Sequence, residues 1–213
     1  MKTTYGQFYH LNLAARLFIM LVLVSITAAF TADYEPVLAA EKYLITIEQA
    51  NQAHDYALQY VSNEVAYLYG GRLSVEAYLA ALADGKVPGE EIGADASAVV
   101  VNAYRHVIPN IRFFFDETQK ALVTDATSGL IANYNSVLIS RDQLVPGDLI
   151  FFKDAFGNIS GVAIFSEFKG DVVHFVTASA SRGKVVRTNA YVNGDFWTSS
   201  FAGFGRLQYA IAE

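Results

Sequence analysis

The residues that could do chemistry in this chain are few, and none of them is a cysteine. The 213 residues include four histidines, and none lies at metal-ligand spacing from another histidine or from paired carboxylates. The lack of cysteine excludes disulfides, thiolate metal sites and a cysteine nucleophile. The sequence also lacks a phosphate-cradling loop, a dinucleotide fingerprint, a His-Glu-x-x-His motif and a Gly-x-Ser-x-Gly elbow. We therefore expect neither a metal nor a cofactor.

Three segments, in a fixed order, contain the polar and glycine residues from which a site could be built. The segments are Tyr67-Leu-Tyr-Gly-Gly71, Gly93-Ala-Asp-Ala-Ser-Ala98 and Leu144-Val-Pro-Gly-Asp-Leu-Ile-Phe-Phe152, the last followed by Gly161-Val-Ala-Ile-Phe165 and His174. In the second segment, Asp95 precedes a predicted helix over 96–107 and is a good N-cap, because its carboxylate can accept hydrogen bonds from the backbone N–H groups of the first turn.

In order and spacing, these segments resemble the NlpC-type cell-wall cysteine peptidases, a papain-like family that cleaves the peptide stems of peptidoglycan. The resemblance covers about residues 65–208. It implies that Ala96 occupies the nucleophile position, that Gly161 occupies the position of the partner histidine, and that His174 occupies the third position. Alanine has no lone pair with which to attack, and glycine supplies no base. The resemblance therefore implies a relative without an intact catalytic site.

The same resemblance implies which residues would line the substrate groove. Tyr67, Asp95 and Ser97 match positions that hold the polar end of the stem peptide, and His174 is a further candidate. Each also has a structural interpretation: Asp95 and Ser97 would cap the helix, Tyr67 would pack, and His174 would be a half-buried strand histidine. Ser97 is a poor replacement nucleophile, because it points about 100° around the helix from Ala96.

The elements that must position these residues are helices first and strands afterwards, which predicts an α+β fold of the papain-like type, with N-terminal helices packed on a C-terminal antiparallel sheet. We expect helices over 36–68, 73–83 and 96–107, and strands over 149–152, 161–165, 171–177, 184–188 and 205–211. Gly70 and Gly71 would end the first helix. Its apolar stripe would comprise Leu44, Ile47, His54, Leu58, Val61, Val65 and Leu68.

The N-terminal segment Leu17 to Ala32 carries no charge and follows Lys2 and Arg16, a pattern typical of an export signal or a membrane anchor. We therefore expect an exported protein in the periplasm or cell envelope, either free or membrane-anchored. The expected divisions are a signal or anchor over 1–32, an amphipathic helix over 33–64 and a peptidase-like domain over 65–213. A net charge of −6 without a Lys/Arg cluster argues against nucleic-acid binding.

Three functions fit these observations. The first is a catalytically inactive peptidase-like domain that binds peptidoglycan stem peptides or an envelope protein, as a binding or scaffolding protein. The second is a peptidoglycan endopeptidase that hydrolyses stem-peptide amides with other residues. The third is a structural subunit of an envelope complex. The missing groups at Ala96 and Gly161 favour the first.

Overall fold

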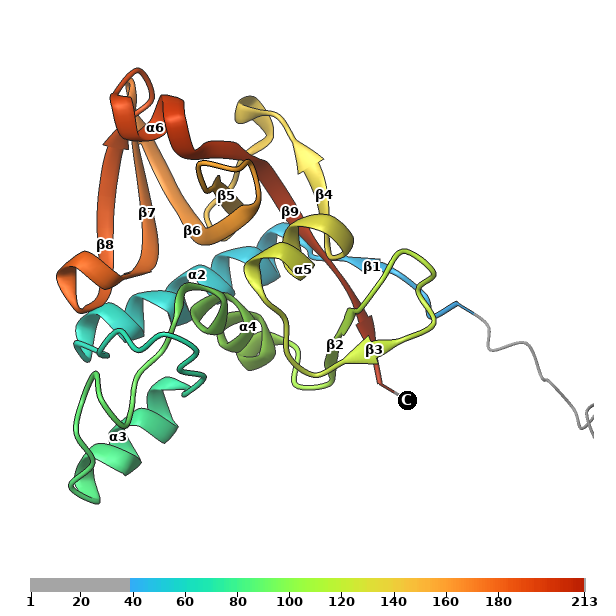
Figure 1. Cartoon of the computed structure of the whole chain (residues 1–213). Coiled ribbons are helices and arrows are strands. Elements are labelled where there is room, and N and C mark those ends of the chain that lie inside the picture. Colours follow the sequence, from blue (N-terminus) through green and yellow to red (C-terminus); the bar gives the residue numbers. More distant parts are fainter. Residues whose placement is uncertain (1–38, 213) are drawn as a thin grey trace, which may run out of the picture. The chain divides into compact units, whose positions relative to one another are not determined.

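The computed structural model describes residues 39–212, which form an α+β fold around one antiparallel sheet (Figure 1). The sheet has the strand order β3-β2-β9-β5-β6-β7-β8, and β1 and β4 also pair with β9. The helices are α2 (Ile47–Ser62), α3 (Val75–Ala83), α4 (Ala96–Val107), α5 (Ser128–Tyr134) and α6 (Asp195–Ser200). The strands are β1 (Tyr43–Leu44), β2 (Ile111–Phe114), β3 (Leu122–Val123), β4 (Ser136–Ile139), β5 (Leu149–Lys153), β6 (Ile159–Lys169), β7 (Val172–Ser179), β8 (Lys184–Tyr191) and β9 (Phe201–Ile211).

The predicted class, with helices packed on an antiparallel sheet, is confirmed, and α4 has the predicted bounds of 96–107. Asp95 caps this helix as expected, since its Oδ1 accepts a hydrogen bond of 2.8 Å from the backbone N–H of Ala98. The predicted strands correspond to β5, β6, β7, β8 and β9, all paired antiparallel. Four short strands were not predicted, namely β1, β2, β3 and β4.

The first helix is shorter than the prediction of 36–68. α2 begins at Ile47 because Thr46 forms a capping box: Thr46 Oγ1 accepts from the backbone N–H of Gln49, and Gln49 Oε1 accepts from that of Thr46. Before the cap, the chain is extended and β1 pairs with β9. The helix ends at Asn63, so Gly70 and Gly71 belong to a later turn and do not stop it.

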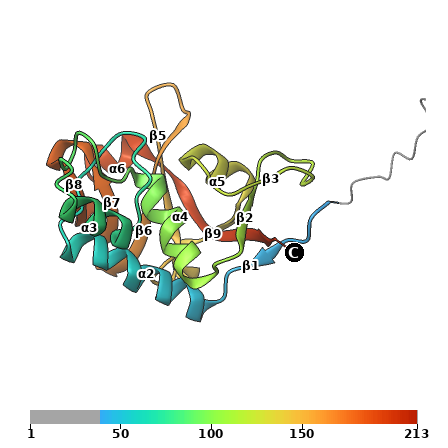
Figure 2. The ribbon, with the colours of Figure 1, turned by 90° about the horizontal axis from the view of Figure 1, so that it is seen from below.

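The buried face of α2 also differs from the predicted stripe. The buried residues are Ala50, Ala53, Tyr56, Ala57 and Tyr60, whereas the side chain at the expected stripe position Ile47 is 55% exposed. Small alanines allow α2 to lie directly against α4, and Figure 2 shows these two helices side by side.

The Pro146-Gly147-Asp148 turn is fixed by packing and by a buried ion pair. Gly147 has φ of +100°, and a Cβ there would lie 1.9 Å from the backbone oxygen of Ala50, so only glycine fits. The fully buried carboxylate of Asp148 accepts hydrogen bonds from Arg206 Nε at 2.9 Å and from Arg206 Nη2 at 2.8 Å. The turn therefore joins α2, β5 and β9 into one unit.

Two apolar clusters cover the two faces of the sheet. The larger one contains α2, α4 and residues such as Val162 and Ile164 of β6. The second lies on the other face, where Trp197 of α6 stacks on Phe201 with ring centroids 4.6 Å apart. Phe152 and Ala163 belong to this aromatic cluster. The alternation along β6 therefore decides which side chains can reach α4.

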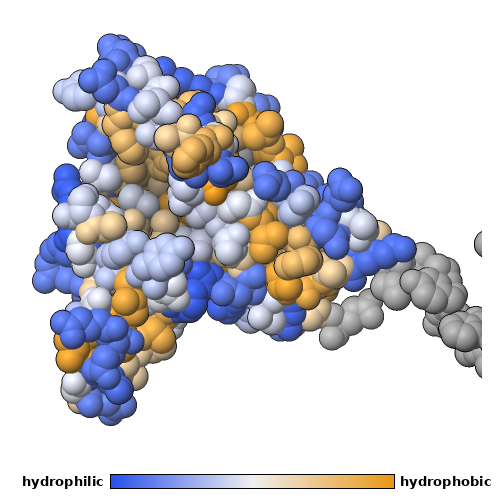
Figure 3. All heavy atoms as spheres, in the orientation of Figure 1, coloured by the Kyte–Doolittle hydropathy of each residue, from blue (hydrophilic) through white to orange (hydrophobic). Residues whose placement is uncertain are grey.

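Some apolar side chains remain at the surface, as Figure 3 shows in orange over α3 and β4. They are scattered in the manner usual for globular proteins. Within residues 39–212, no helix has the length and apolar character needed to cross a bilayer. The predicted signal or anchor over Leu17–Ala32 lies outside the described residues.

Candidate functional site

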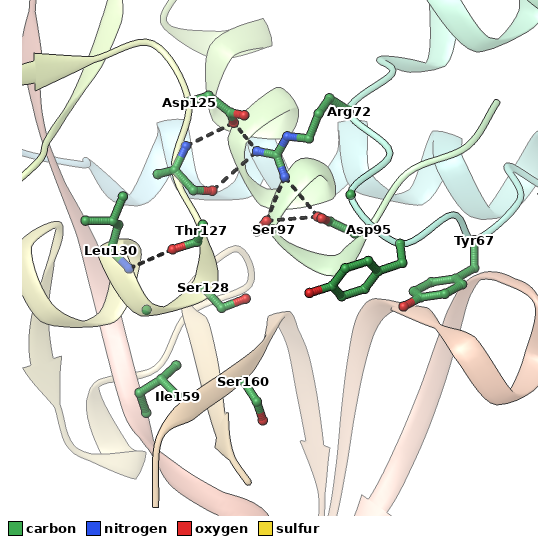
Figure 4. Close-up of a pocket in the computed structure, with 14 residues that line it drawn as sticks. Tyr67, Arg72, Asp95, Ser97, Asp125, Thr127, Ser128, Leu130, Ile159 and Ser160 are labelled. Atoms are coloured by element: carbon green, nitrogen blue, oxygen red, sulfur yellow. Dashed lines mark hydrogen bonds and ion pairs between the residues drawn. The ribbon is translucent and has the colours of Figure 1, made fainter. Parts of the chain in front are cut away.

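An open pocket of about 650 Å³ lies at the N-terminus of α4. Its walls come from the turn over 67–72, the start of α4, the loop that leads into α5 and the first residues of β6 (Figure 4). The residues that line it are mostly polar or small: Tyr67, Tyr69, Gly70, Arg72, Asp95, Ser97, Asp125, Ala126, Thr127, Ser128, Gly129, Leu130, Ile159 and Ser160. Three of the predicted groove residues, Tyr67, Asp95 and Ser97, are therefore brought together in one pocket.

Arg72 ties the walls of this pocket together. Its Nη1 donates to Asp95 Oδ1 at 2.9 Å and to Ser97 Oγ at 2.7 Å. Its Nη2 donates to a carboxylate oxygen of Asp125 and, at 3.3 Å, to the backbone oxygen of Ala126. Figure 4 shows the guanidinium between the start of α4 and the loop before α5. One cation thus serves two carboxylates, and the pocket has a net negative charge.

Two glycines explain how the turn over 67–72 comes so close to the segment before α4. A Cβ on Gly71 would lie 2.6 Å from the backbone oxygen of Gly93, and a Cβ on Gly93 would lie 2.7 Å from that of Ala66. The two segments are then joined by backbone hydrogen bonds, with Asp95 N–H donating to Gly71 at 2.9 Å. Gly71 and Gly93 are therefore required by close backbone approach.

Ala96 is the first residue of α4 and is half-buried, with its methyl group packed against the apolar core. The adjacent Ser97 is 5% exposed and its hydroxyl is held on both sides: it donates to Asp95 Oδ1 at 2.8 Å and accepts from Arg72. The proton of this hydroxyl is accepted by a carboxylate that is paired with a guanidinium, which is too weak a base to activate a hydroxyl. Neither residue is an activated nucleophile.

Gly161, where the resemblance places the partner histidine, does not face the pocket. Gly161 pairs with Phe152 across β5 and β6, and a Cβ on Gly161 would lie 3.5 Å from Phe152 Cβ. Directly paired residues point to the same face, so this Cβ would point toward the aromatic cluster and away from α4. A bulge precedes this pair, and it is Ser160 that lines the pocket.

His174 is not brought to the pocket. It pairs with Glu167 on β6 and with Asn189 on β8, near the turn of the β6–β7 hairpin. Residue 167 is six positions beyond Gly161, which corresponds to about 20 Å along a strand. Strands β6 and β7 continue well beyond Gly161 before the hairpin turns. His174, expected as the third catalytic position and as a groove residue, therefore lies away from the pocket.

The other two histidines of the described chain also lie elsewhere. His54 Nε2 is 2.9 Å from Ser166 Oγ, between α2 and β6, and burial lowers the pKa of this imidazole. His106 stacks on the ring of Tyr56, with centroids 4.2 Å apart. Within residues 39–212, then, no histidine lines the pocket, and no cluster of His, Cys, Asp and Glu could hold a metal ion.

Sequence reasoning missed Arg72, Asp125 and the hydroxyl groups of Thr127, Ser128 and Ser160. Arg72 had one signal, because it directly follows the glycine pair of the first motif in an acidic chain. The loop residues had none, since they belong to no motif and reach the pocket only through the tertiary fold. Thr127 in addition caps α5, accepting from the backbone N–H of Leu130 at 3.3 Å.

This chain is similar to known proteins in both sequence and structure. Two crystal structures of Ly7917, one with the hydrolysing product of MDP, show TM-scores of 0.41 and identities of 10% and 12%. The alignments cover 78% of this chain and only 62% of those chains. A search of curated proteins gave no match. The family model described as NlpC/P60 matches residues 64–206, which is more than half of the sequence. This chain belongs to the NlpC/P60 family.

Proposed function

We propose that this protein is a non-catalytic member of its family, which binds peptidoglycan stem peptides and serves as a binding or scaffolding protein of the cell envelope. One observation carries the proposal. The first residue of α4, where the family resemblance places the nucleophile, is Ala96, and the pocket beside it holds no cysteine or histidine. The chain retains a pocket without the groups that would cleave a bound peptide.

The pocket has the properties expected of a binding site for a polar ligand. Its volume of about 650 Å³ lies in the usual range for small-ligand sites. The contacts of Arg72 with Asp95, Ser97 and Asp125 hold the walls in place before a ligand arrives, which lowers the entropic cost of binding. Because the carboxylates outnumber the cation, the pocket favours the amino group of a stem peptide over its carboxylates.

The proposal places this domain outside the cytoplasm. It rests on the uncharged segment Leu17–Ala32, which would export or anchor the chain, with residues 33–64 and 65–213 following it. Deletion of residues 1–32 is expected to leave the protein in the cytoplasm. Export of the truncated protein, measured by fractionation, would show that this segment is not the signal.

Binding and cleavage are tested separately with the purified full-length protein. Isothermal titration with soluble muropeptides is expected to show binding, and incubation with purified sacculi is expected to release nothing. Digestion would support the endopeptidase alternative, whereas absence of both binding and digestion would support a structural subunit. Asp125→Asn should weaken muropeptide binding by about two- to fivefold, the effect of one partly exposed charge. The exposed control Asp171→Asn should leave it unchanged.

A further inference from the structure

Tyr69 is an exposed aromatic residue at the edge of the pocket. Its side chain is 89% exposed, although most of the large apolar side chains of the described chain are buried or half-buried. Within residues 39–212 the ring stacks on no other ring and its hydroxyl makes no hydrogen bond. The side chain therefore contributes little to the stability of the fold, and its apolar faces are open to a ligand.

The backbone that carries Tyr69 is held at both ends. Tyr67 N–H donates to the backbone oxygen of Gly183 at 2.8 Å, and Gly71 N–H donates to that of Leu68 at 2.9 Å. Gly70 completes the turn with φ of +71°. The aromatic ring is thus presented by an ordered turn, so a ligand that stacks on it does not have to order the backbone first.

A second exposed aromatic residue precedes β6, the strand whose first residues line the pocket. Phe156 is 90% exposed in the turn between β5 and β6, and three residues later β6 begins with Ile159 and Ser160, which line the pocket. Tyr69 and Phe156 are the two most exposed large apolar side chains recorded for the described residues. Of these two residues, only Tyr69 lines the polar pocket, and its exposure there indicates a ligand with both polar groups and a flat apolar face.

We propose that Tyr69 is a stacking platform for a pyranose ring, so that the ligand of this pocket is a peptidoglycan fragment that still carries its sugar. This inference rests on the proposed function and names the ligand of the same site. The C–H groups on one face of a pyranose are apolar and match the face of an aromatic ring, while the hydroxyl groups around the edge must stay solvated.

An aromatic residue at the edge of the pocket meets both requirements of a sugar: it offers an apolar face for stacking and leaves the sugar hydroxyls in water. An aliphatic peptide side chain would gain little at such a position, because its apolar surface would remain largely in water. The hydroxyls of Thr127, Ser128 and Ser160, which line the same pocket, offer hydrogen-bond partners for the polar edge of a bound ligand.

The test compares two ligands by isothermal titration with the full-length protein: a muramyl-peptide and the same stem peptide without its sugar. Tyr69→Ala is expected to weaken binding of the muramyl-peptide by about two- to tenfold and to leave binding of the free peptide unchanged. Tyr69→Phe should bind both ligands as the wild type does. Tyr191→Ala is the matched control, because Tyr191 is also exposed, at 63%, but lies at the far end of β8 and does not line the pocket.

The outcomes separate this inference from the proposed function. If Tyr69→Ala weakens both ligands equally, or neither, then stacking of the sugar is wrong while the pocket remains a peptide-binding site. If Tyr191→Ala has the same effect as Tyr69→Ala, the effect does not come from the pocket and the inference is again wrong. If the wild type binds neither ligand, the proposed function itself fails, and the inference fails with it.

Discussion

Replacing Ala96 with cysteine would restore the family's nucleophile but not its activity. The new thiol would stand at the first residue of α4, where the free N–H groups and the helix dipole stabilise a thiolate. Amide hydrolysis also needs a group that protonates the leaving amine, and no histidine of the described chain lines the pocket. We therefore expect Ala96→Cys to hydrolyse no stem peptide.

The distances in the structure set the size of this effect. Proton transfer requires heavy atoms within about 3.2 Å of each other. His174 pairs with Glu167, six positions along β6 from Gly161, so it lies about 20 Å along the sheet from Gly161. Members of a catalytic triad act as a unit, and loss of one removes about six orders of magnitude in kcat. The rate of Ala96→Cys should be indistinguishable from the background rate.

The assay is digestion of purified sacculi followed by chromatography of the released fragments, with iodoacetamide labelling to show that the thiol is accessible. A pair of double variants tests the geometry. Ala96→Cys with Ser160→His places an imidazole on the pocket side and is expected to give measurable hydrolysis, whereas Ala96→Cys with Gly161→His directs it toward Phe152 and is expected to give none. Turnover by the wild type would refute the reasoning. So would hydrolysis by Ala96→Cys with Gly161→His when Ala96→Cys with Ser160→His shows none.

Three further predictions concern stability. Arg206→Met should lower the free energy of unfolding by about 3–5 kcal/mol in urea, because it leaves the buried Asp148 carboxylate unpaired, while the exposed control Arg182→Met should change little. Gly147→Ala should cost about 4 kcal/mol or more, seen as loss of soluble protein or a much lower Tm. Burial lowers the pKa of His54 below its usual 6.5, so on acidification the unfolded chain binds this proton before the folded chain does. The free energy of unfolding should therefore fall as the pH drops below 6.5. His54→Gln should flatten this part of the plot of Tm against pH.

Local signals were sufficient for part of this fold. The cap at Asp95 predicted the start of α4, and β-branched residues after turns predicted the central strands. The start of α2 was wrong because apolar spacing was given more weight than the capping box at Thr46. Pairing of β1 with β9 joins residues far apart in the sequence, and no local pattern indicates it.

The candidate site was predicted in part for the same reason. Tyr67, Asp95 and Ser97 lie in motifs, and the fold brings them together. Counting residues could not place His174, because the position of a strand residue depends on where its hairpin turns. Here the turn lies at Gly170, which has φ of +62°. After the bulge between Phe165 and Glu167, β6 and β7 form three more pairs before they reach this turn.

The residues that match the family pattern and those that depart from it differ in physical role. Gly71 and Gly93 allow two backbones to touch, Gly147 avoids a clash with Ala50, and Asp148 is paired where it is fully buried. Each of these residues would be costly to change in any protein with this fold, whether or not it cleaves a substrate. Gly161 has no such constraint, since a Cβ there would meet Phe152 at an ordinary contact distance of 3.5 Å. A sequence can therefore keep these motifs for packing alone, whatever its activity, and the ligand proposed for the pocket is best sought through Arg72, Asp125 and Tyr69, which line it.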